Sequence, residues 1–249
     1  MNPKRMLRNQ VCAILLGAFA FAIAHQPAAA QDAATPYPKM APLEQYLMDR
    51  DAEIALARSA APDAISHDAT VFVLTQHGYE LAVKGTNGWV CWVGRAWLAM
   101  FDHPEYWNPK VRAAECINPP GARSLMPLAF KRTELVLAGR SKAEVVAALK
   151  AAFDKKELPA VEPGAASYMM SKSSYLTDAG DHNMPHLMFF AAVNSDANWG
   201  GVQQLAPAMS VNYWYMSPDA YPGLKSFPPL SVFLVGADKW SDGSSAPSM

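Results

Sequence analysis

The spacing of hydrophobic positions predicts a first helix between Leu43 and Ala60. Apolar residues recur there at helical spacing, and acidic residues such as Glu53 occupy the remaining positions. Pro62 follows and ends the segment. We therefore expect one amphipathic helix whose acidic side chains face solvent.

A second helix begins after Ser141. Ser141 and Glu144 have the spacing of a capping box, in which each side chain bonds a backbone amide that the helix leaves unpaired. An apolar stripe continues to Phe153, and Pro159 follows. Residues 125–138 fit a helix or a strand equally well.

Strands are predicted by short β-branched or alternating segments. Residues 70–75 are apolar on both faces, residues 80–84 alternate, and residues 89–93 return after Asn87-Gly88. Asn-Gly favours a type I′ hairpin turn, which needs positive φ at both central residues. We therefore expect an antiparallel β-meander, with Cys91 in its third strand.

The last third of the chain is predicted to be rich in strands. The candidates are residues 165–170, 186–193 and 230–235. The segment between the last two, 194–229, has the composition of a long irregular loop, and the four prolines of residues 102–124 also indicate irregular structure.

These elements define an α+β fold: an antiparallel β-meander with flanking helices and a long irregular C-terminal loop region. The expected boundaries are an extended leader at 31–42, a single domain at 43–240 and a disordered Ser/Gly/Pro tail at 241–249.

Residues 1–30 have the pattern of a secretory signal peptide. A basic head precedes the short apolar stretch 11–24, and Ala28-Ala29-Ala30 offers small residues for cleavage before Gln31. The protein is therefore expected to be exported, either to the periplasm of a bacterial envelope or into the medium.

Signal cleavage changes the charge and the list of partners. It removes three basic residues (Lys4, Arg5 and Arg8), so the formal net charge falls from −1 to −4. A mildly acidic surface argues against nucleic acid as a partner. No later apolar run approaches the roughly 20 residues of a membrane-spanning helix, so a soluble product is expected.

Cleavage also removes Cys12 and leaves Cys91 and Cys116. In an oxidising compartment an isolated pair of cysteines usually forms a disulfide, which we predict here. The alternative is two buried thiols that pack as small apolar side chains.

One segment has candidate metal ligands. In an extended chain His182, Met184, His186 and Met188 project to one side, and imidazole with thioether suits copper. Pro185 disrupts this geometry.

Zinc is the second option for the same segment. His182 and His186 with Asp178 or Asp181 would supply three ligands for a hydrolytic site. The helix that usually carries His-x3-His is interrupted by Pro185, and no Glu follows His182. A Gly-x-Ser-x-Gly elbow and a dinucleotide fingerprint are both absent.

Aromatic residues of the 194–229 loop are the candidate ligand-binding surface, because long loops often carry function. They are Trp199, Tyr213, Trp214 and Tyr215. The sequence thus predicts a non-catalytic domain that binds a small molecule or a glycan; the alternative is a metal-binding protein or a metal-dependent hydrolase with copper or zinc.

Overall fold

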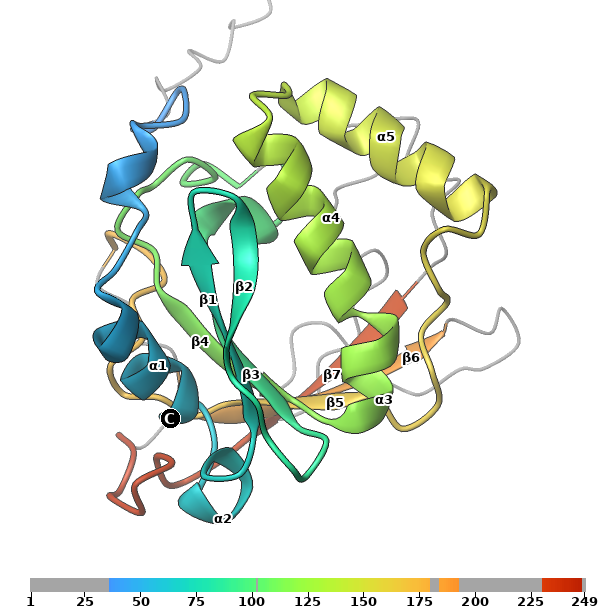
Figure 1. Cartoon of the computed structure of the whole chain (residues 1–249). Coiled ribbons are helices and arrows are strands. Elements are labelled where there is room, and N and C mark those ends of the chain that lie inside the picture. The colour runs from blue at the N-terminus through green and yellow to red at the C-terminus, as the bar shows by residue number, and fades with distance from the viewer. Residues whose placement is uncertain (1–35, 102, 180–183, 193–229, 248–249) are drawn as a thin grey trace, which may run out of the picture. The chain divides into compact units, whose positions relative to one another are not determined.

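The structure is a computed structural model, and it describes residues 36–101, 103–179, 184–192 and 230–247. All of them belong to one compact unit, Ala34–Met249. They form a mixed sheet of seven strands with helices packed on it, which confirms the α+β class (Figure 1).

The elements have the following bounds. The helices are η1 (Leu43–Gln45), α1 (Arg50–Arg58), α2 (Asp63–Ser66), η2 (Ala96–Leu98), α3 (Pro119–Ser124), α4 (Met126–Leu137) and α5 (Lys142–Asp154). The strands are β1 (Thr70–Thr75), β2 (Gly78–Val83), β3 (Val90–Gly94), β4 (Ala113–Ile117), β5 (Ala166–Met169), β6 (His186–Ala192) and β7 (Leu230–Gly236).

The strand order is β2-β1-β3-β4-β5-β6-β7. Strands β3 to β7 pair antiparallel with their neighbours in sequence, so they form a meander. Strands β1 and β2 form an antiparallel hairpin, but β3 pairs with β1 and runs parallel to it. The predicted meander over residues 69–94 is therefore wrong for its third strand.

The loop between β2 and β3 explains this difference. The backbone N–H groups of Thr86 and Asn87 donate to the carbonyl oxygen of Asp68, so the chain passes the start of β1 instead of turning back beside β2. Gly85 permits this crossing, because a Cβ there would lie 2.2 Å from the backbone nitrogen of Thr70. Gly88 has a positive φ of 78°, whereas Asn87 does not, so no type I′ turn forms.

The two faces of the sheet are covered by different helices. Helix α1 packs on β1, β3 and β4, against the face that includes Cys91 and Val93. Helix α4 lies over the opposite face, which includes Trp92 and Ile117, and α5 packs on α4 (Figure 1). Strand alternation therefore places Trp92 and Cys91 in different layers of the molecule.

The predicted helix at 43–60 is two elements. Asp49 caps α1 by accepting hydrogen bonds from Asp51 N and Ala52 N, which separates α1 from η1. Glu53, expected on the exposed side, is fully buried and pairs with Arg95 at 2.9 Å. This ion pair links α1 to the residue that follows β3.

The next two helices lie where the sequence left the choice open or predicted a helix. Residues 125–138, which fitted a helix or a strand, contain α4. Helix α5 begins at the predicted capping box of Ser141 and Glu144. The irregular segment 102–124 contains β4 and α3, which the sequence analysis did not predict.

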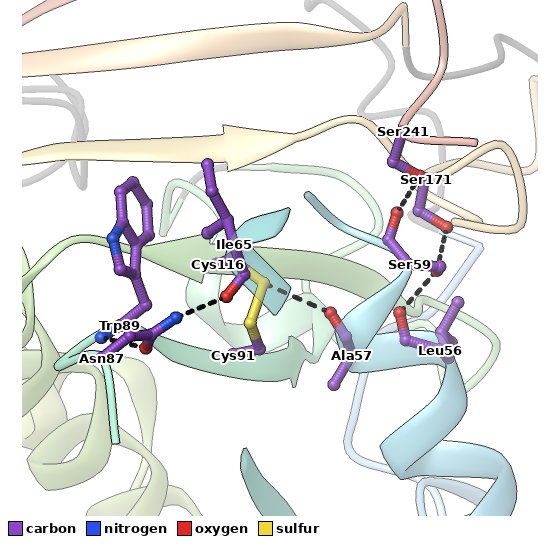
Figure 2. The surroundings of a disulfide bond; sticks show 10 residues. All are labelled: Leu56, Ala57, Ser59, Ile65, Asn87, Trp89, Cys91, Cys116, Ser171 and Ser241. Carbon is purple, nitrogen blue, oxygen red and sulfur yellow. Dashed lines mark hydrogen bonds between the residues drawn. A yellow bond between two sulfur atoms is a disulfide. The ribbon is translucent and has the colours of Figure 1, made fainter. Parts of the chain in front are cut away.

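The predicted disulfide between Cys91 and Cys116 is present, with 25 residues of sequence separation (Figure 2). Cys116 lies on β4 directly opposite Cys91 on β3, not in an irregular segment. Both cysteines are fully buried under α1, and Cys116 Sγ lies 3.5 Å from the carbonyl oxygen of Ala57.

The described part of the C-terminal segment, up to residue 247, forms hydrogen bonds with distant parts of the chain. Ser241 donates from its hydroxyl to Ser59 O (Figure 2). Its backbone N–H donates to Met170 O. Ser59 also bonds Ser171 at 2.6 Å, so three distant segments meet there. No helix among the described residues is long and apolar enough to cross a membrane.

Candidate functional site

A cavity of about 420 Å³ lies on the sheet face that α4 covers. Its floor comes from β3 to β7, and its walls come from α4, from η2 and from the loop that leads to β4. Most of its lining is apolar, with Ile117, Leu128, Met188, Phe190 and Leu234 among the residues.

Strand register explains which side chains reach this floor. Trp92 on β3 pairs with Glu115 on β4, and Met169 on β5 pairs with His186 on β6. The register of β4 and β5 continues to place Met169 beside Glu115. One row across four strands therefore carries two polar groups, Glu115 and His186, separated by one strand and so by about 10 Å between backbones.

Glu115 is the acidic side chain of this row, and it lines the cavity. Burial in apolar surroundings disfavours the charged carboxylate and raises its pKa to about 7. The neighbouring Ser167 hydroxyl opposes part of this shift, although the contact is too loose to be a hydrogen bond of normal geometry. The carboxyl group therefore exchanges its proton near neutral pH.

His186 is the other polar group of the row. Its Nδ1 lies 2.7 Å from the carbonyl oxygen of Met184, which accepts only, so Nδ1 carries the proton. Burial lowers the pKa of the ring, and a neutral ring leaves Nε2 as an acceptor. Among the described residues no hydrogen bond to this Nε2 is present.

Two further polar groups near Glu115 have no hydrogen-bond partner in the described part of the chain. They are Trp92 Nε1 and Ser167 Oγ, and both are buried. Buried polar groups are usually satisfied, so unpaired ones at a cavity floor point to a ligand or to water.

The other charged groups of the cavity lining have partners. Arg95 pairs with Glu53, and Arg132 lies 3.9 Å from the centre of the Phe101 ring and donates to Ala99 O. Glu105 accepts hydrogen bonds from Thr177, from Asn108 and from the backbone of Asp178. These groups hold the cavity walls together.

His103 also lines the cavity. Its Nδ1 accepts a hydrogen bond from the backbone N–H of Glu105, which requires a neutral ring.

The residues proposed from the sequence for ligand binding lie outside the described residues. This holds for Trp199, Tyr213, Trp214 and Tyr215, and also for His182. The cavity is a different candidate site, and its floor was not recognised from the sequence.

Of the remaining metal candidates, Asp181 also lies outside the described residues, and the others are described. His186 and Met188 both line the cavity, in agreement with the predicted alternation, whereas Met184 holds the ring of His186 through its carbonyl oxygen. Asp178 is bonded by Tyr37, Tyr175 and Lys110, so its carboxylate is already occupied. Within the described ranges no group of three or more His, Cys, Asp or Glu is placed to hold a metal ion.

Glu115 carried a weak signal in the sequence. It is one acidic residue in an otherwise apolar run, Ala113–Ile117, which has the alternation of a half-buried strand. The surrounding prolines concealed that strand.

No protein-family model, curated protein or solved structure matches the chain.

Proposed function

We propose that the protein is an exported binding protein for a small, largely apolar molecule, which occupies the cavity under α4. The observation that carries this proposal is the cavity itself. Its volume of about 420 Å³ lies within the usual range for small-molecule sites. An apolar lining with a few polar groups at one side is also the common composition of such sites.

Export is part of the proposal. The signal-peptide pattern of residues 1–30 supports it, and the Cys91–Cys116 disulfide is consistent with folding in an oxidising compartment. The site of action is the periplasm or the medium.

Filling the cavity tests the proposal. Ala129 lines the cavity on α4, so Ala129→Leu reduces the space without breaking the helix. Ala147→Leu is the matched control, because Ala147 is exposed on α5. Ligands are first sought by thermal shift with small alcohols, amines, acids and aromatic compounds.

The expected result is that binding weakens at least about tenfold in Ala129→Leu and is unchanged in Ala147→Leu. A ligand that binds both variants equally lies outside the cavity. A panel in which no compound raises the melting temperature argues against the function itself.

The second candidate function is the metal site at His182 and His186. One observation favours it: Nε2 of His186 has no hydrogen bond among the described residues and is available as a ligand. Metal analysis of protein purified without an affinity tag tests it, and copper or zinc well below one equivalent excludes the site.

A further inference from the structure

We infer that the ligand of the cavity carries a basic amine, whose ammonium group is held by Glu115 at the polar side of the floor. This inference rests on the proposed function, because it names the class of molecule that the cavity takes. The ligand is then a compact apolar body with one amine at its end.

Glu115 differs from the other charged side chains of the cavity lining in its contacts. Arg95 pairs with Glu53, Arg132 donates to the carbonyl oxygen of Ala99, and Glu105 accepts a hydrogen bond from Thr177. Within the described part of the lining, Glu115 is the charged side chain that has neither an ion pair nor a hydrogen bond of normal geometry.

No counter-ion lies beside Glu115 among the described residues. The side chain is half-buried at the cavity and forms no ion pair with a Lys or Arg of the described ranges. A carboxylate in apolar surroundings is stabilised by an ion pair and by hydrogen bonds, and an ammonium group supplies both a charge and donors.

Acceptors on the floor match the donors of an amine. An ammonium group has three N–H donors, and the two oxygens of the Glu115 carboxylate are acceptors for them. Trp92 pairs with Glu115 across β3 and β4, and its ring attracts a cation that sits beside the carboxylate. A neutral alcohol uses one acceptor and gains no charge attraction.

The proton of Glu115 gives the inference a pH dependence. With a pKa near 7 in the free protein, the carboxyl is partly protonated at neutral pH, and an ammonium group beside it favours the ionised form. Binding an amine therefore releases protons near pH 7. Affinity for the amine rises between pH 6 and pH 8, because a larger fraction of Glu115 is already ionised.

The facing groups do not reverse this direction. They are Tyr79 from β2, Trp92 from β3, Ser167 and Met169 from β5, and His186 from β6, none of which carries a charge here. On the walls, Arg95 is paired with Glu53, and Arg132 and Glu105 have opposite signs.

Matched pairs of ligands test the inference by calorimetry at pH 8. Hexylamine is compared with hexanol, and phenethylamine with phenethyl alcohol, so each pair shares its apolar body. The amine is expected to bind at least about tenfold more tightly than its alcohol. In Glu115→Gln this advantage is lost while the alcohol still binds; Glu134→Gln, on the exposed side of α4, is the matched control and keeps it.

A second measurement does not depend on a variant. Titration of the unaltered protein near pH 7 in two buffers with different ionisation enthalpies reports the protons released on binding. The amine is expected to release protons and the alcohol none.

The outcomes separate the two proposals. Alcohols that bind as tightly as amines, or amine binding without proton release, overturn the amine inference and leave the cavity as a binding site. If no member of either pair binds, both the inference and the proposed function are contradicted.

Discussion

At the scale of the residue, the Glu115 carboxyl makes the free energy of unfolding depend on pH. Its pKa is about 7 in the folded protein and 4.5 in the unfolded chain, so the unfolded chain loses its proton first as the pH rises. Stability therefore falls between pH 4.5 and pH 7. Above pH 7 this difference between the two pKa values lowers the free energy of unfolding by at most about 3 kcal/mol.

Glu115→Gln removes this dependence, because the amide does not titrate. We expect the variant to match the unaltered protein at pH 4 and to exceed it by about 2 kcal/mol at pH 8, after a discount for water in the cavity. Urea unfolding at both pH values measures the difference. If the two proteins differed in free energy of unfolding by the same amount at pH 4 and at pH 8, Glu115 would ionise as an ordinary surface carboxyl.

The buried ion pair between Glu53 and Arg95 could not be predicted from the sequence. Glu53 lies two residues after the exposed Asp51 of α1 and has no distinguishing pattern, yet it pairs with Arg95 and accepts from Leu74 N. Such pairs depend on where β1 and β3 place their ends, which is long-range information. Glu115 was missed because the surrounding prolines concealed the strand that carries it.

At the scale of the element, the most local signals were the most reliable. The capping box of Ser141 and Glu144 needs only four consecutive residues, and both of its hydrogen bonds form. Ser141→Ala removes the cap and is expected to lower the free energy of unfolding by about 1 kcal/mol. Thermal unfolding measures this loss.

Ser141→Asp is the matched control, since Asp caps a helix as well as Ser does. It is expected to retain most of the stability. If Ser141→Asp loses as much free energy of unfolding as Ser141→Ala, the loss comes from packing at this position and not from the cap.

Signals that depend on pairing were less reliable at this scale. Asn87-Gly88 favours a hairpin locally, but the hydrogen bonds to Asp68 take the chain past the start of β1. Strand β4 was concealed for a similar reason: it is held by Cys91 and Tyr168, which are far from it in the sequence. The α+β class was predictable, whereas the parallel pair β1–β3 and the cavity floor were not.

At the scale of the whole molecule, the disulfide joins two neighbouring strands of the sheet, β3 and β4, on the face that α1 covers. It closes a loop of 25 residues, and the entropy that such a bond removes from the unfolded chain corresponds to about 3 kcal/mol of stability. Because Cys91 and Cys116 are fully buried, reducing agent is expected to reach them only when the chain unfolds.

The count of free thiols therefore reports both the disulfide and the processing of the chain. Mature protein that begins at Gln31 is expected to show no free thiol when it is denatured without reduction, because both remaining cysteines are bonded. Oxidised precursor that keeps residues 1–30 shows one thiol per chain, that of Cys12. A thiol assay combined with intact mass distinguishes these forms, and two thiols in the mature chain would disprove the bond. Replacement of both cysteines by Ala then gives the contribution of the disulfide by urea unfolding, which is expected to be about 3 kcal/mol.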